Sequence, residues 1–140
     1  MAAAALMAAA ISCSKAAFDA GWLPETGPGE FRLSGAVYAK SSGNAAGIEA
    51  VEGIRITVDS YAADDPEHVS PVDRDTVWTD DYGRWYVINQ CIPGGSYVVE
   101  ACDMDGEENG GRFSSKKLDI ITDKKCQSMD NQIFFLERLD

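Results

Sequence analysis

Residues that could bind a metal ion are concentrated in one loop, "CDMDGEENGG" at 102–111. Read from Asp105, side-chain oxygens stand at the first, third and fifth positions (Asp105, Glu107 and Asn109), and a glycine stands at the sixth. Carboxylate and amide oxygens at this spacing suit a hard cation such as Ca²⁺, and glycine permits the sharp turn. The twelfth position is Lys116, where a complete loop of this type has a bidentate glutamate.

A calcium site at this loop would therefore need oxygen ligands from elsewhere in the chain. Asp103 precedes the loop, and Asp80 and Asp81 lie in a second acidic turn that we expect at the same end of the fold. These residues complete the predicted ligand set, with Ca²⁺ as the candidate cofactor. The alternative is a solvated acidic turn, in which Gly110 and Gly111 serve the backbone geometry alone.

Little else in the chain points to catalysis. His68 is the only histidine and stands in a polar, proline-flanked segment, without a nearby cysteine or second histidine to share a zinc ion. We expect this histidine to be solvated. No phosphate-binding, dinucleotide-binding or nucleophile-elbow motif occurs. We expect no enzymatic activity, and a hydrolase that uses paired carboxylates is the remote alternative.

The composition restricts the partners. Asp and Glu outnumber Lys and Arg by 23 to 12 in a chain of 140 residues, which gives a net charge of −11. Such a surface repels phosphate backbones, so we expect no nucleic-acid partner. The hydrophobic share of 45% suffices for a packed core, and the length fits one domain with a short extra segment.

From Phe31 onward, hydrophobic residues recur at every second position, which is the period of a half-buried strand. "GIRITVDSY" shows the alternation clearly, with Ile54, Ile56 and Val58 between polar residues. Seven such runs are separated by turns rich in glycine, proline and aspartate. We predict an all-β domain at residues 31–140, a seven-stranded antiparallel Ig-like or transthyretin-like β-sandwich.

The same alternation sorts the aromatic residues. Trp85 shares the inward phase with three other residues, Val87, Tyr97 and Val99, and is expected in the core. Trp78 follows the inward Val77 and is expected at the surface. Together with Tyr82 and Tyr86, an exposed Trp78 could stack on sugar rings. The alternative, which we favour from the sequence alone, is a sheet face that the N-terminal segment partly covers.

The first residues differ from the rest. "MAAAALMAAAIS" is uncharged and too short for a membrane-spanning helix, and it has the character of a secretory signal. The small residues before Cys13 resemble a bacterial lipobox. We predict a lipoprotein signal peptide at 1–12, a lipid on Cys13, and a lipid-anchored tether at 13–30, although Trp22 and Leu23 could dock on the domain instead. The alternative is an alanine-rich start with an incidental cysteine.

The order of the strands predicts which cysteines can pair. In an up-and-down sandwich alternate loops share an end, which places Cys91 and Cys126 together and Cys102 at the opposite end. An envelope lipoprotein occupies an oxidising compartment, so we predict a Cys91–Cys126 disulfide and a free Cys102. Three reduced thiols are the alternative.

A specific resemblance covers about half of the chain. "GAVY" at Gly35, "EGIRITV" at Glu52, "TDDYGRWYV" at Thr79 and "IPGGSYVVEA" at Ile92 stand in the order typical of bacterial carboxypeptidase-regulatory-like domains. Val51 departs from that pattern, because the family often has proline there. The resemblance implies a transthyretin-like sandwich.

A closer resemblance is to small lipoproteins encoded beside radical-SAM enzymes. It is carried by "DTVWTDDYGRWYV", by "VVEACDMDGEENGGRFSSKKLDI" and by the lipobox. It implies an envelope protein that is an interaction module or the substrate of a companion radical-SAM enzyme, with a glycan or protein partner and the membrane as its anchor. Carbohydrate or calcium binding is the alternative function. "DTV" at 75–77 also matches a short O-glycosylation sequon, with Thr76 as the acceptor.

Overall fold

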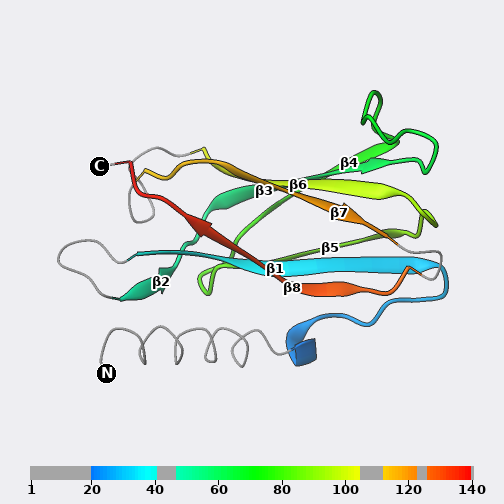
Figure 1. Cartoon of the computed structure of the whole chain (residues 1–140). Helices are drawn as coiled ribbons and strands as arrows, with labels where there is room; N and C mark the ends of the chain where they lie inside the picture. The colour runs from blue at the N-terminus through cyan, green and yellow to red at the C-terminus, as the bar shows by residue number, and fades with distance from the viewer. Residues whose placement is uncertain (1–19, 41–46, 105–111, 123–125, 140) are drawn as a thin grey trace, which may run out of the picture.

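The computed structural model describes residues 20–40, 47–104, 112–122 and 126–139, which form two β-sheets facing each other (Figure 1). The elements follow in the order η1 (Ala20–Trp22), β1 (Glu30–Lys40), β2 (Ile48–Ala50), β3 (Ile54–Tyr61), β4 (Asp73–Trp78), β5 (Arg84–Gln90), β6 (Ser96–Asp103), β7 (Lys116–Ile121) and β8 (Met129–Leu136). The predicted all-β sandwich is confirmed. The strand that the sequence pattern missed is β2, which is only three residues long.

The first sheet is built around β1, which pairs with β5, with β2 and with β8. The second sheet has the order β4-β3-β6-β7, and all of its pairs are antiparallel. β5 and β4 are the outermost strands of their sheets on one side of the sandwich.

One strand pair departs from the predicted antiparallel arrangement, because β8 runs parallel to β1. The reason is the even number of chain reversals between these two strands. Each connection between the seven longer strands reverses the chain direction, so the first and the seventh of them point the same way. When these two become neighbours in one sheet, they can only pair in parallel.

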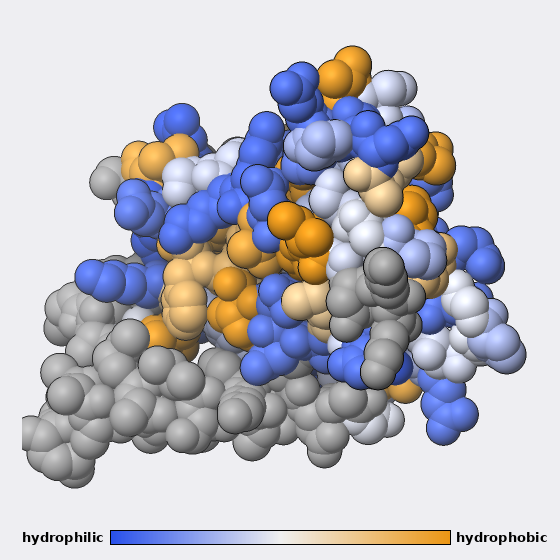
Figure 2. Space-filling model, turned by 45° about the vertical axis from the view of Figure 1, so that its right-hand side comes forward, coloured by the Kyte–Doolittle hydropathy of each residue, from blue (hydrophilic) through white to orange (hydrophobic). Residues whose placement is uncertain are grey.

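The core consists of the inward-facing residues of both sheets, as the alternation predicts. Ile54, Ile56 and Val58 are at most 1% exposed, and Trp85 is 2% exposed. Val87, Tyr97 and Val99 are buried with them, which confirms the predicted inward phase. On the face shown in Figure 2 the surface is mainly hydrophilic, with some hydrophobic side chains gathered near the middle and others at the margins.

Gly35 lets β1 and β8 approach closely. A Cβ atom built at this position would overlap the carbonyl oxygen of Gln132 and would lie 3.0 Å from the ring of Trp85. The backbone of β8 thus occupies the space that any other residue at position 35 would need. The parallel pairing of β1 with β8 depends on this glycine.

The loops meet at the two ends of the sandwich as predicted. At one end, the Gly53 amide donates to the Thr79 carbonyl at 3.1 Å. At the other end, Cys91 and Cys126 form the predicted disulfide, with their Cα atoms 5.8 Å apart. Cys102 is free and half-buried.

The segment before β1 packs against the sandwich. Leu23 is 7% exposed, and the Pro24 carbonyl accepts a hydrogen bond from Arg32 of β1 at 2.6 Å. Arg32 also makes two hydrogen bonds to Asp130 of β8, at 2.9 and 2.7 Å. Of the two alternatives for Trp22 and Leu23, docking on the domain is the one observed. Among the described residues, no helix is long and apolar enough to cross a membrane.

Candidate functional site

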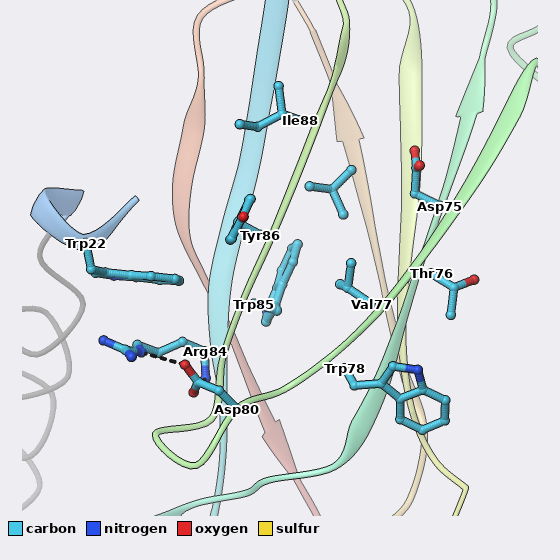
Figure 3. A pocket seen from close by; sticks show the side chains of 11 residues that line it. Trp22, Asp75, Thr76, Val77, Trp78, Asp80, Arg84, Trp85, Tyr86 and Ile88 are labelled. Carbon is cyan, nitrogen blue, oxygen red and sulfur yellow. Dashed lines mark hydrogen bonds and ion pairs between the residues drawn. The ribbon is translucent and has the colours of Figure 1, made fainter. Parts of the chain in front are cut away.

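A groove of about 500 Å³ follows the seam between β4 and β5 (Figure 3). Its floor is made by inward-phase residues of the two strands, Val77, Trp85 and Val87. Its walls are made by outward-phase residues of the two strands, by Asp75 in the same phase as Val77, by the turn before β5 and by the docked N-terminal segment, which together contribute Trp22, Asp75, Thr76, Trp78, Asp80, Arg84, Tyr86 and Ile88. The groove therefore has an apolar floor and walls that combine aromatic rings with carboxylates and a hydroxyl group.

The exposed residues of the β4 wall are explained by the alternation of inward and outward side chains along this edge strand. Val77 points toward the sandwich interior, so Thr76 and Trp78 on either side of it point outward (Figure 3). Trp78 is 54% exposed, as the sequence predicted, and Thr76 is exposed as well. A large aromatic ring at the surface is costly to leave in water and is common where a protein binds a partner.

The β5 wall is partly formed by the N-terminal segment. Tyr86 is 40% exposed, and its ring meets the indole of Trp22 edge to face, with 6.0 Å between centroids. Trp22 is thus a groove residue although it precedes the first strand. The N-terminal segment thus partly covers Tyr86, as one of the sequence alternatives expects, whereas Trp78 stays exposed. Sugar binding by these rings stays a prediction.

Among the described residues that line the groove, Arg84 is the only cationic one, and its guanidinium is already engaged. The carbon at its centre lies 4.4 Å from the ring centroid of Trp22 and 4.7 Å from that of Tyr82. Its Nε donates to Asp80 at 2.9 Å. An arginine between two rings and a carboxylate is well placed for cation–π stacking and has little capacity left for an anionic ligand.

Asp80 holds the turn that leads into β5. One carboxylate oxygen accepts the backbone amides of Tyr82 and Arg84, at 2.9 and 2.8 Å, while the other accepts the Arg84 side chain. The turn closes at Gly83, whose φ of 73° lies in the left-handed region. Asp80 is therefore a structural acid that fixes the position of Arg84.

Asp75 and Thr76 are the polar groups of the β4 wall. One carboxylate oxygen of Asp75 accepts a hydrogen bond from Asn89 of β5, which ties the two edge strands together. Thr76 is exposed, and its side chain points outward from β4, on the side away from Val77 and Trp85 (Figure 3). Such groups can accept hydrogen bonds from ligand hydroxyls.

The predicted calcium ligands are placed only in part. Asp105, Glu107 and Asn109 lie outside the described residues. Asp103 accepts the Phe113 amide at 3.1 Å, and Asp81 is exposed. Within the described ranges, no group of three histidine, cysteine or acidic side chains could hold a metal ion. Calcium binding by this loop stays a prediction.

His68 is more ordered than the sequence suggests. Its ring stacks on Tyr61 with 4.3 Å between centroids, and its Nε2 lies 2.8 Å from the Ser96 hydroxyl. Its φ of 57° is left-handed, and the turn is held by Asp65, whose carboxylate accepts two backbone amides, Val69 and Ser70. These two hydrogen bonds lower the pKa of Asp65. The expectation of a freely solvated histidine is wrong, because this cap turns the ring onto the sandwich.

The remaining predicted modification sites have different positions. Cys13 lies outside the described residues, so its lipidation stays a prediction. Thr76 is exposed on the groove wall, which meets the steric requirement for a glycan acceptor.

Two groove residues were not expected from the sequence. Trp22 was assigned to a tether, and the only signal of its role was the apolar pair that it forms with Leu23. No pattern in the sequence pointed to Arg84. The spacing of Asp80 and Arg84, four residues apart across a glycine turn, is compatible with the observed ion pair.

The chain has little detectable similarity to known proteins. No family model and no curated protein matches it. The major plantain pollen allergen is 14% identical, with 79% of this chain and 94% of the allergen covered and a TM-score of 0.44. A putative carbohydrate binding protein from Pseudomonas aeruginosa is 19% identical, with 79% and 89% covered and a TM-score of 0.41. These likenesses concern the sandwich fold alone.

Proposed function

We propose that this domain is a non-catalytic carbohydrate-binding module that holds a sugar ring in the groove between β4 and β5. The observation that carries the proposal is the 54% exposed Trp78 on a groove wall that also offers Thr76 and Asp75. An aromatic face packs against the C–H face of a sugar, while the neighbouring oxygens accept hydrogen bonds from its hydroxyls.

The charges of the groove favour an uncharged sugar. Arg84 is engaged by Asp80 and by two aromatic rings, so the lining offers no free cation to a carboxylate or sulfate group. Asp75 and Asp80 add negative charge beside it. An anionic sugar would lose its hydration without gaining a counter-charge, whereas a neutral sugar would meet hydrogen-bond acceptors.

The test is a binding measurement with and without the exposed ring. Isothermal titration against neutral oligosaccharides found positive on a glycan panel is expected to give a measurable Kd. Trp78→Ala should weaken it about ten-fold, since an aromatic contact contributes on the order of 1.4 kcal/mol. Val69→Ala is the matched control, because Val69 is 78% exposed but lies outside the groove. Absence of binding to every neutral glycan, or equal affinity of the Trp78→Ala variant, would refute the proposal.

The proposal includes an extracytoplasmic position, with a lipid on Cys13 as the anchor. The Cys91–Cys126 disulfide supports this, because disulfides persist mainly in oxidising compartments. A binding module held at the envelope would bring surface or extracellular glycans to the cell.

A further inference from the structure

A second hollow, of about 310 Å³, lies on the outer face of the second sheet. Its lining differs from that of the groove, because it is almost entirely polar and charged. The polar and charged residues of its lining include Thr57, Asp59, His68, Glu100, Lys117 and Asp119. They come from β3, β6, β7 and the loop that His68 occupies.

The strand register brings this hollow next to the groove. Thr57 lines the hollow, Thr76 lines the groove, and the two are direct partners in the β3–β4 ladder. Long side chains flank this pair on both sides, since the preceding outward position carries Arg55 opposite Trp78 and the following one carries Asp59 opposite Arg74. The two short threonines thus stand between two pairs of longer side chains, and we call this low position of the ladder the passage between the two depressions.

One border of the passage is rigid. Arg74 donates from Nε and Nη2 to the two carboxylate oxygens of Asp59, at 2.6 and 2.8 Å. This hydrogen bonding lowers the pKa of Asp59. A fork-like arginine–carboxylate pair of this kind holds both side chains in one orientation.

Beyond the passage, the hollow offers hydrogen-bonding groups of both kinds. Glu100 and Lys117 are partners in the β6–β7 ladder, but in the described part of the chain neither makes an ion pair or side-chain hydrogen bond. Asp119 is likewise without such a partner. Free acceptors beside a free ammonium donor match hydroxyl groups, which donate and accept. His68, fixed by its contact with Tyr61, borders the hollow at the Ser96 end of the sheet.

We infer that the hollow is a second sugar subsite, and that the ligand is an oligosaccharide running from the groove across the Thr76–Thr57 passage to Glu100 and Lys117. The inference rests on the proposed carbohydrate function and extends it. From β4 to β7 the path crosses three strand spacings, about 14 Å in all. A single sugar ring in the groove could not reach Lys117, so affinity should depend on chain length.

The experiment measures the affinity of the full chain for oligosaccharides of increasing length. Neutral oligosaccharides of one linkage, from two to six units, are titrated into the wild type and into a Glu100→Ala/Lys117→Ala variant. The wild type should gain about ten-fold in affinity along the series, whereas the variant should gain less than about three-fold and keep the disaccharide affinity. Lys116→Ala is the matched control, because Lys116 is the exposed neighbour of Lys117 on β7 but lines neither depression.

The possible results separate the two hypotheses. Equal affinity for all chain lengths, or a length-dependent gain that survives in the double variant, would overturn the second subsite while the groove proposal stands. Failure of every oligosaccharide to bind would overturn both. A double variant that melts at the wild-type temperature but also loses disaccharide binding would contradict the inference as well.

Discussion

Asp130 of β8 is hydrogen-bonded to two side chains of β1, and through one of them, Arg32, it is linked to the N-terminal segment. It accepts from Arg32 and from the buried Ser34, and Arg32 in turn reaches the Pro24 carbonyl. Burial acts to raise the pKa of Asp130, but the hydrogen bonds from Arg32 and Ser34, with the charge of Arg32, outweigh it and lower the pKa.

The lowered pKa fixes the direction of a pH effect. Because the folded-state pKa lies below the unfolded value of about 3.9, the ionised Asp130 stabilises the fold fully above about pH 4 and loses this effect as the pH falls further. Asp130→Asn should lower the free energy of unfolding by about 2 kcal/mol at pH 7, with a smaller difference at pH 3. Urea unfolding at both pH values measures this, and Asp59 and Asp65 titrate equally in both proteins. A difference that is constant with pH would contradict the role of this carboxylate.

Gly35 is a second residue whose replacement has a defined cost. Gly35→Ala places a methyl group on the Gln132 carbonyl, so β8 must move away from β1. We expect a loss of about 2–3 kcal/mol in the free energy of unfolding. Gly27→Ala is the control, because its Cβ would meet only the flexible Glu30 side chain and should change stability by less than about 0.5 kcal/mol. Similar melting temperatures for both variants would show that the β1–β8 contact is looser than described.

At the scale of elements, the disulfide joins the start of the β5–β6 turn to the segment that leads into β8. Cys91 and Cys126 are 35 residues apart, and Cys126 is 7% exposed. The Cys91→Ala/Cys126→Ala variant should be less stable by about 3–4 kcal/mol on the chain-entropy model. Cys102→Ala should leave the denaturation midpoint nearly unchanged, since Cys102 is free. An equal loss in both variants would mean that packing of the thiols, and not the cross-link, matters.

The loop between β6 and β7 carries the calcium prediction. If Asp105, Glu107 and Asn109 bind Ca²⁺ with help from Asp103, saturating calcium should raise the free energy of unfolding by about 2–3 kcal/mol over an EDTA-treated sample. Thermal melting in the two buffers measures this, and Asp105→Asn/Glu107→Gln should abolish the difference. Identical melting temperatures in calcium and in EDTA would favour the solvated acidic turn.

At the scale of the whole molecule, the intact mass of the protein from its native envelope tests several predictions together. We expect the mass of a chain that begins at lipidated Cys13 and contains one disulfide. A further increment of glycan mass would place a sugar on Thr76, and any other change would indicate modification by a companion enzyme, as the family resemblance implies. A mass without lipid would remove the membrane anchor from the proposal.

The sandwich could be predicted because each strand can be recognised from a short stretch of consecutive residues. The alternation of Ile54, Ile56 and Val58 is visible in nine consecutive residues, and the disulfide follows from counting strands between two cysteines. The parallel β1–β8 pair follows from the same counting once the two strands are known to be neighbours, which the sequence does not show. The groove was harder to predict, because Trp22 and Arg84 meet across 62 positions and belong to no common pattern.

The docking of Trp22 and Leu23 would also determine how far the domain can move from the proposed lipid anchor. With the proposed lipid on Cys13, seven Cα–Cα steps separate Cys13 from Ala20, a covalent reach of about 25 Å at most. Such a short tether would keep the groove near the bilayer surface. The protein would then sample glycans in a thin layer above its own membrane, and release of the segment at 20–29 would be needed to extend that layer.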